Sequence, residues 1–186
     1  NYDEWWIKEI LMQIKTSVIL WNYNEENIIK KTINNLLNFN SDIEIIIVDD
    51  SSTDNTVKII QELNQKEVKL IQRKSRGLAS ACLTGLLYSN GENICWIDSN
   101  LPDLAEKIPV MIDKLEQKNI VIMSRYVEGG KDLRSKQRII SSWLINFMCR
   151  IFLDWSIKDY TSSIFLMRKE VLNYGVPIAY GHGEFF

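Results

Sequence analysis

Asp98 and Asn100 are the side chains whose types and spacing most directly suggest chemistry. An apolar run, residues 94–97, ends at Asp98, and the amide of Asn100 follows two residues later. Hard divalent cations prefer oxygen ligands, so this pair could hold Mg2+ or Mn2+ beneath a pyrophosphate group. In the alternative interpretation, both side chains only begin a turn and cap the next helix.

Two other polar turns occupy the same position relative to apolar runs. Residues 22–25 follow the run 17–21, and residues 49–54 follow the β-branched run 43–48. Ligands of an open parallel sheet bind just outside the carboxyl ends of its strands. We therefore expect the three polar turns to gather along one edge of a sheet, where a nucleotide would lie.

The elements that must position these turns alternate between strand and helix from residue 17 to residue 124. The periodicity predicts strands at 17–21, 43–48, 68–72, 93–98 and 120–124, with helices at about 25–38, 55–64, 78–89 and 104–117. This alternation predicts a parallel α/β sheet with right-handed crossovers. Asn24 is the expected N-cap of the first of these helices.

The pattern changes after residue 124. A basic stretch at 131–138 precedes an apolar helix at about 139–152, a strand at 164–168 and an irregular segment at 171–179. Positive charge beside an apolar helix suits a prenyl phosphate. Alternatively, the cations are simply solvated and the aromatic side chains of the helix belong to the core.

Residues 1–15 form a separate N-terminal segment. Its apolar residues recur at helical spacing, which predicts an amphipathic helix over residues 3–15. Such a helix packs on the domain or on another subunit, or it docks at a membrane surface.

Composition narrows the functional classes. The 186 residues carry a net charge of −2 without a long basic tract, so nothing favours nucleic-acid binding. The three cysteines lack metal-ligand spacing and fall in apolar patterns, which predicts buried free thiols in a reducing compartment. The single His182 excludes a histidine-cluster metal site.

The sequence contains neither a membrane-spanning run nor a signal-peptide pattern. We therefore expect a cytoplasmic protein, peripheral or anchored at the cytosolic face of a membrane. An anchor beyond residue 186 stays open.

Several common catalytic motifs are missing from the sequence. It contains no glycine-rich phosphate loop of the GxGxxG or GxxxxGK type and no Gly-x-Ser-x-Gly elbow. The sequence still offers an acidic edge that could bind a metal, with a basic loop and an apolar helix beside it. That combination suits a nucleotide-sugar donor, a divalent cation and an anionic, apolar acceptor.

Six motifs, in this order and spacing, resemble the family-2 glycosyltransferases of GT-A fold. They are VILWNYNEENI (18–28), IIVDDSSTDNT (46–56), RGLASACLTG (76–85), IDSNL (97–101), SRYVEGG (124–130) and DYTSSIF (159–165). Within that family the chain is most similar to the dolichol-phosphate mannose synthase and polyprenyl-phosphate glycosyltransferase branch. The resemblance implies a single GT-A domain over residues 16–186, with a nucleotide-binding part at 16–124 and an acceptor-side part at 125–186.

The resemblance also implies a set of donor-site residues. Asp98 and Asn100 would bind the metal, with Asp98 and Ser99 at the diphosphate. The remaining expected contacts to the nucleotide-sugar are Tyr23, Glu25, Val48, Asp50 and Gly77.

The resemblance implies that Arg125, on the acceptor side, binds a phosphate of the acceptor or of the donor. Arg138 substitutes for a second basic residue that the family has near position 137, and Asp159 lines the sugar site. Asp98, Asp159 and Arg125 are the expected catalytic residues.

The implied reaction is an inverting transfer of a hexose from a GDP- or UDP-linked donor to a polyprenyl or dolichyl phosphate. Transfer to a saccharide hydroxyl, or nucleotide-sugar binding without catalysis, are the alternatives, and an oligomer is possible. Asn100 stands where the family has a second aspartate, Trp21 replaces a proline and Ser163 replaces a glycine. These departures leave donor choice and activity open.

Overall fold

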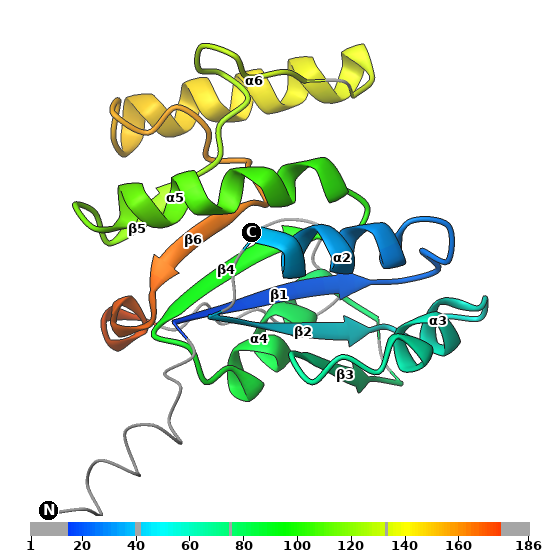
Figure 1. Cartoon of the computed structure of the whole chain (residues 1–186). Coiled ribbons are helices and arrows are strands. Elements are labelled where there is room, and N and C mark those ends of the chain that lie inside the picture. Colours follow the sequence, from blue (N-terminus) through cyan, green and yellow to red (C-terminus); the bar gives the residue numbers. More distant parts are fainter. Residues whose placement is uncertain (1–14, 40–41, 75, 133, 176–186) are drawn as a thin grey trace, which may run out of the picture.

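Six strands form one mixed sheet in the computed structural model, which describes residues 15–39, 42–74, 76–132 and 134–175 (Figure 1). The strands are β1 (Thr16–Asn22), β2 (Ile43–Asp49), β3 (Val68–Gln72), β4 (Asn93–Asp98), β5 (Ile120–Ile122) and β6 (Phe165–Arg168). Their order is β3-β2-β1-β4-β6-β5. The predicted N-terminal helix lies outside the described residues.

The far end of the sheet differs from the expected parallel alternation. β6 lies between β4 and β5 and runs antiparallel to both, whereas β1 to β4 are parallel to one another. β6 contributes the fully buried Leu166, which pairs with Cys95 on one side and Val121 on the other. The short β5, with Ile120 and Ile122 exposed, suits an edge position. A mostly parallel sheet flanked by helices is nevertheless confirmed.

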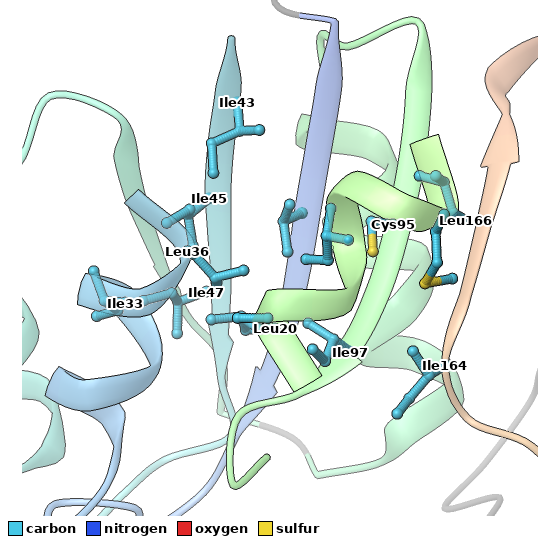
Figure 2. Packing of buried hydrophobic residues seen from close by; sticks show 14 of the residues in the cluster. Leu20, Ile33, Leu36, Ile43, Ile45, Ile47, Cys95, Ile97, Ile164 and Leu166 are labelled. Atoms are coloured by element: carbon cyan, nitrogen blue, oxygen red, sulfur yellow. The ribbon is translucent and has the colours of Figure 1, made fainter. Parts of the chain in front are cut away.

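Helices cover both faces of the sheet because side chains alternate along each strand. Val18 and Leu20 of β1 face a cluster with α2 (Ile29–Phe39), α3 (Thr56–Leu63) and α5 (Ile108–Leu115), which a 3-10 segment, η1 (Pro102–Lys107), precedes. Figure 2 shows this side, where Ile45 and Ile47 of β2 lie near Ile33 and Leu36 of α2.

The opposite face packs against α4 (Leu78–Tyr88). Ile19 and Trp96 belong to this cluster, together with Cys82 of the helix. A Cβ atom at Gly85 would lie 2.3 Å from Cγ2 of Ile19, so the small residue permits a close approach of α4 to β1. The predicted buried free thiols are confirmed at Cys82 and Cys95, and Cys149 is half-buried.

Two local predictions are wrong. Asn24 does not cap α2, since the helix begins at Ile29 and the Asn24 Oδ1 accepts a hydrogen bond from the Thr53 backbone N–H at 2.8 Å. Asn24 has a φ of 55°, a left-handed conformation that asparagine tolerates, and the side chain therefore reaches the loop after β2. The segment predicted to be irregular, residues 171–179, overlaps a 3-10 helix, η2 (Lys169–Tyr174), and its residues 176–179 lie outside the described residues.

Helix α6 (Lys136–Phe152) lies at the margin of the molecule, outside the helices that cover the sheet (Figure 1). Trp143, Phe147 and Phe152 are exposed, as is Trp155 just beyond the helix. The interpretation that these aromatic side chains belong to the core is therefore wrong.

Candidate active site

The polar turns after β1, β2 and β4 gather at one edge of the sheet, as expected from the sequence. In the strand register, Trp21 lies beside both Val48 and Asp98, and Asn22 lies beside Asp49. The carboxyl ends of three neighbouring parallel strands therefore meet, which is where open α/β sheets bind ligands.

Asp98 stands at the end of β4, and its side chain is half-buried. The carboxylate Oδ2 accepts a hydrogen bond from Ser163 Oγ at 3.3 Å. Burial raises the pKa of Asp98, and the Ser163 hydrogen bond offsets only part of that effect. A partly desolvated carboxylate with a raised pKa gains from a nearby positive charge.

Helix α2 holds the turn that follows Asp98. Thr32 Oγ1 donates to the backbone carbonyl of the buried Ser99 at 2.6 Å, and Asn35 Nδ2 donates to the carbonyl of Pro102 at 3.1 Å. Leu101 occupies the N-cap position of η1, without a side-chain cap. The alternative in which Asp98 and Asn100 cap the next element is therefore not supported.

Glu25 completes an acidic group of side chains at this edge. Burial raises the pKa of Glu25, repulsion from Asp54 and Asp98 raises it further, and the Asn100 side chain lowers it. These interactions bring Glu25, Asp98 and Asn100 into one neighbourhood. The sequence-based prediction that the turns after β1 and β4 share a site agrees with this arrangement.

The oxygen atoms at this edge suit a hard divalent cation that also binds the diphosphate of a nucleotide. Asp98 offers a carboxylate and Asn100, which is exposed, offers an amide oxygen. Across the described ranges, no group of three or more histidine, cysteine, aspartate or glutamate side chains is arranged to hold a metal ion. A cation here would therefore take its remaining ligands from water and diphosphate oxygens.

Asp50, expected to contact the nucleoside, is fully engaged by the protein. Its carboxylate accepts hydrogen bonds from Arg73 Nε at 2.7 Å and Nη2 at 2.5 Å, from Trp21 Nε1 at 3.0 Å and from the Gly77 N–H at 2.9 Å. A carboxylate has about four acceptor positions, so these contacts saturate it. Gly77 has a φ of 144°, which glycine adopts most readily.

Tyr23 lies next to this network with its ring covered. The Arg76 guanidinium lies 4.0 Å from the ring centroid and also donates a hydrogen bond to the Tyr23 hydroxyl. Val48, expected to contact the nucleoside through its backbone, has a fully buried side chain. Basic and aromatic groups therefore border the acidic edge on the side of β2 and β3.

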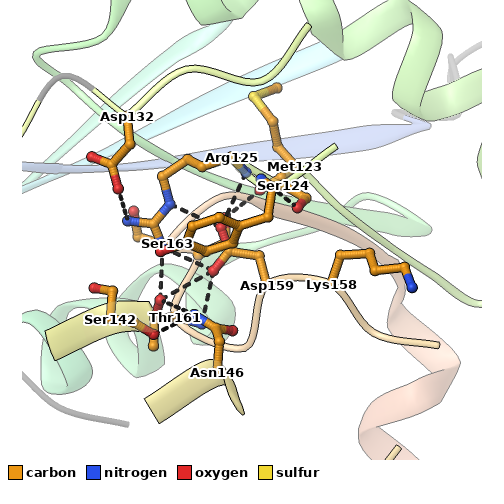
Figure 3. A network of polar contacts seen from close by, with 12 residues as sticks. Met123, Ser124, Arg125, Asp132, Ser142, Asn146, Lys158, Asp159, Thr161 and Ser163 are labelled. Carbon is orange, nitrogen blue, oxygen red and sulfur yellow. Dashed lines mark hydrogen bonds and ion pairs between the residues drawn. The ribbon is translucent and has the colours of Figure 1, made fainter. Parts of the chain in front are cut away.

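Arg125 and Asp159, both expected on the acceptor side, bind each other (Figure 3). Arg125 Nε and Nη2 each lie 2.8 Å from an Asp159 oxygen, and the Arg125 N–H donates to Oδ2 at 3.1 Å. Burial alone would raise the pKa of Asp159, but the hydrogen bonds and charge of Arg125 lower it overall. Arg138 is exposed on the first turn of α6.

The Arg125–Asp159 pair extends into a wider polar network. Thr161 Oγ1 accepts from Arg125 Nη2 at 2.7 Å and from Asn146 Nδ2 at 3.0 Å. Asp132 lies 3.9 Å from Arg125 Nη1 and forms a closer pair with Arg134, which lowers the Asp132 pKa to about 2. The network thus ties the loop after β5 and helix α6 to the turn before β6 (Figure 3).

Sequence reasoning missed several residues of this site. They are Thr32, Arg73, Ser163, Asn146 and Asp132. Two had a usable signal. Arg73 directly follows β3 at the same sheet edge, and Asn146 lies four residues after Ser142, on the same face of a helix that is apolar around it.

A family profile described as "Glycosyl transferase family 2" matches residues 17–175. The chain belongs to glycosyl transferase family 2. The match spans the whole sheet, the acidic edge and the Arg125–Asp159 network. The resemblance seen in the six motifs is therefore confirmed.

Two curated members of the family are named for polyprenyl-phosphate substrates. A dolichol-phosphate mannosyltransferase of Pyrococcus furiosus is 38% identical over 170 residues, covering 86% of this chain and 47% of that protein. An undecaprenyl-phosphate 4-deoxy-4-formamido-L-arabinose transferase of Proteus mirabilis is 26% identical, covering 86% of this chain and 50% of that protein. The chain spans about half the length of these relatives.

Two solved structures share the architecture. Glucosyl-3-phosphoglycerate synthase of Mycobacterium tuberculosis, in complex with Mn2+, UDP and glucosyl-3-phosphoglycerate, has a TM-score of 0.64 at 20% identity, covering 85% of this chain and 58% of that chain. S. aureus TarS 1–349 in complex with UDP has a TM-score of 0.55 at 22% identity, covering 86% of this chain and 48% of that chain. At these identities the likeness concerns the fold, and it confirms the GT-A prediction.

Proposed function

We propose that this chain is the catalytic domain of an inverting glycosyltransferase. It transfers a hexose from a GDP- or UDP-linked donor to a polyprenyl or dolichyl phosphate at the cytosolic face of a membrane. The observation that carries the proposal is the Ser163–Asp98 hydrogen bond, because it joins the acidic edge to the turn that holds Asp159. The names of the two polyprenyl-phosphate relatives support the acceptor class.

The donor would lie across the carboxyl ends of β1, β2 and β4. Asp98 and Asn100 would hold Mg2+ or Mn2+, which, when bound, neutralises charge on the leaving diphosphate. Ser99 would present its backbone to the diphosphate, while Tyr23 and Glu25 would border the nucleoside. Asp50 would shape this site indirectly, since its carboxylate fixes Arg73 and Gly77.

The acceptor would approach from the side of Arg125. A phosphate acceptor is already ionised at neutral pH, so it needs little help from a general base. Asp159 would be a weak base, because its pKa is lowered and its carboxylate is hydrogen-bonded to Arg125. This agrees with an acceptor that needs no general base. Asp159 would therefore orient Arg125 for a phosphate oxygen, with Arg138 as a second cation.

The proposed membrane location concerns the surface of a bilayer. None of the helices in the described part of the chain is long and apolar enough to cross a membrane. We propose peripheral or anchored attachment at that surface.

Calorimetry with GDP and UDP, each with and without Mn2+, tests the donor site first. We expect one nucleotide to bind, more tightly with Mn2+, and binding of neither nucleotide under either condition would refute the proposal. The control is Asp103→Ala, which removes an exposed carboxylate from η1 and should bind nucleotide as the unchanged protein does.

A transfer assay then tests the acceptor. Sugar label from the preferred donor should move into an organic-extractable product when a polyprenyl phosphate is supplied. If label moves only to a saccharide acceptor, the acceptor is a sugar hydroxyl and the lipid-phosphate proposal is wrong. Nucleotide binding without transfer to either would identify a binding protein.

A further inference from the structure

The loop after β5 folds back on the backbone of Arg125. Gly129 has a φ of 79°, which glycine adopts most readily, and the Gly130 N–H donates to the Val127 carbonyl at 2.8 Å. A Cβ atom at Gly130 would lie 2.5 Å from the Arg125 carbonyl oxygen, so a larger residue would prevent this close return. The chain then continues to Asp132, whose Oδ2 lies 3.9 Å from Arg125 Nη1. The two glycines therefore bring a second carboxylate to Arg125, in addition to Asp159.

Arg125 hydrogen-bonds to the protein through only part of its guanidinium group. A guanidinium has five N–H donors. Three of them, on Nε and Nη2, are used by Asp159 and Thr161. Nη1 makes no hydrogen bond with the described residues, and Asp132 stays beyond hydrogen-bond distance on this side of the group (Figure 3). The two N–H groups of Nη1 are therefore the part of Arg125 that remains for a ligand.

Arg134 holds Asp132 in this position. Arg134 Nε donates to Asp132 Oδ1 at 2.8 Å and Nη2 donates to Oδ2 at 2.6 Å, so two parallel hydrogen bonds fix the carboxylate. The Arg134 backbone N–H donates to Oδ1 at 3.2 Å. The hydrogen bonds from Arg134 lower the Asp132 pKa to about 2, so the carboxylate is charged at neutral pH. The Oδ2 atom that stays 3.9 Å from Arg125 is thus bound closely by Arg134.

Among the described residues, Asp132 is the one hydrogen-bonding partner of the Arg134 side chain. Both side-chain hydrogen bonds go to this residue, two positions earlier in the chain. The Arg134 side chain is 32% exposed. A local, partly exposed ion pair adds little to the stability of a domain. The main effect of the pair is therefore on the charge beside Arg125 rather than on folding.

The balance of charge shows what Arg134 contributes. Two arginines and two aspartates, Arg125, Arg134, Asp132 and Asp159, together carry no net charge. Without the Arg134 cation, the remaining three side chains would have a net charge of −1, and Asp132 could close on Arg125 Nη1. Carboxylates and phosphates bind a guanidinium with the same geometry. Asp132 would then compete with an anionic ligand for Arg125.

We propose that Arg134 is a positioning residue for the acceptor phosphate. It holds Asp132 away from Arg125, and Arg125 Nη1 thereby stays available for an oxygen of a prenyl phosphate. Arg134 acts through Asp132 and does not itself contact the acceptor. The inference rests on the proposed function for the identity of this ligand.

Steady-state transfer by the full chain tests this role, with the preferred nucleotide-sugar donor at saturation and geranyl phosphate as a water-soluble acceptor. Arg134→Gln should raise the KM for geranyl phosphate about tenfold, the loss expected for one charge-assisted hydrogen bond, and should leave the KM for the donor within about twofold. Lys118→Gln is the matched control, because it removes an exposed cation between α5 and β5. Its KM values should stay within about twofold of those of the unsubstituted chain.

A second substitution distinguishes positioning from direct contact. Asp132→Asn removes the competing charge, so this variant should keep the KM for geranyl phosphate within about twofold. The double variant Asp132→Asn/Arg134→Gln should recover to within about threefold of the unsubstituted chain. If Arg134 bound the phosphate itself, the double variant would retain the full defect of Arg134→Gln. Urea unfolding of each variant verifies that the fold is retained.

Three results would overturn the inference while transfer to geranyl phosphate upholds the proposed function. They are an unchanged KM in Arg134→Gln, no recovery in the double variant, and an equal loss with a neutral saccharide acceptor. If the chain binds geranyl phosphate without transferring sugar to it, calorimetric Kd values replace KM in the same comparison. If the unsubstituted chain neither binds nor uses geranyl phosphate, the proposed acceptor and this inference are both wrong. A failure at the donor site is detected separately, by the absence of GDP and UDP binding.

Discussion

The substitution Asp50→Asn tests whether the Asp50–Arg73 pair is a structural support of the donor edge. The Asp50 side chain is 1% exposed and that of Arg73 is 10% exposed. Asparagine preserves the shape of the side chain but removes its charge. It also replaces one acceptor oxygen with an amide group that faces donors, namely Trp21 Nε1 and the Gly77 N–H or Arg73.

The expected loss in the free energy of unfolding follows from the burial of this ion pair. Removing one partner of a buried ion pair destabilises a protein by about 3–5 kcal/mol, because the other charge stays buried without compensation. Domains of this kind have total stabilities of about 5–15 kcal/mol, so Asp50→Asn should lose a large share and still fold in part. The double variant Asp50→Asn/Arg73→Met removes the orphaned cation, and its loss should be at least about 2 kcal/mol smaller than the sum of the single losses.

Equilibrium urea unfolding, followed by tryptophan fluorescence, measures these free energies. The control is Asp103→Asn, whose pair with Lys31 has side chains that are 79% and 59% exposed. Such a surface pair contributes about 0–1 kcal/mol. A loss below about 1 kcal/mol for Asp50→Asn, or strict additivity in the double variant, would refute the assignment of Asp50 as a buried support.

Four further expectations concern the acidic edge and the thiols. Asp98→Ala should abolish transfer without a large change in urea midpoint, and full retained activity would show that the site is elsewhere. Asn100→Asp should tighten Mn2+ binding measured by calorimetry, since it adds a charged ligand; an unchanged affinity would argue against Asn100 as a ligand. Because burial raises the pKa of Asp98, Mn2+-dependent nucleotide binding should decline at a higher pH on acidification than an ordinary carboxylate would give, and a pH titration of the calorimetric affinity checks this. Burial raises the pKa of both Cys82 and Cys95 to about 12, so a thiol reagent at pH 8 should label Cys149 first, and mass spectrometry of the labelled peptides identifies the order.

The sequence predicted the four parallel strands β1 to β4 well because their signals are local. The β-branched run that became β2 is buried along its whole length, and the polar turn at Asp98 follows β4 directly. Each of these features depends on neighbouring residues and on the rule that ligands bind at the carboxyl ends of parallel strands.

The strand order at β6 could not be predicted in the same way. Pairing between β4 and β6 joins residues about seventy positions apart, and no local pattern distinguishes an antiparallel insertion from another parallel addition. The outward orientation of α6 was equally inaccessible, because its apolar periodicity is compatible with a core helix or an interfacial one.

The site was predicted at the level of residue positions rather than partners. Asp50 and Asp159 were expected to face ligands, yet each is bound by an arginine, Arg73 in one case and Arg125 in the other. Ion pairs between distant residues leave no trace in local spacing. The sequence nevertheless located the neighbourhood of Asp98, because that turn depends only on where a strand ends.

The position of β6 has a consequence for how the polypeptide is made. During synthesis, β4 remains an open sheet edge until residues 165–168 emerge, and β5 lacks the strand that pairs with it. Unpaired apolar edges promote association between nascent chains. A polypeptide that stopped at residue 124 would carry the acidic turn but retain that open edge, so residues 16–124 depend on β6 to complete their sheet. Chaperone protection of the ribosome-bound chain should therefore end only after the last strand is released.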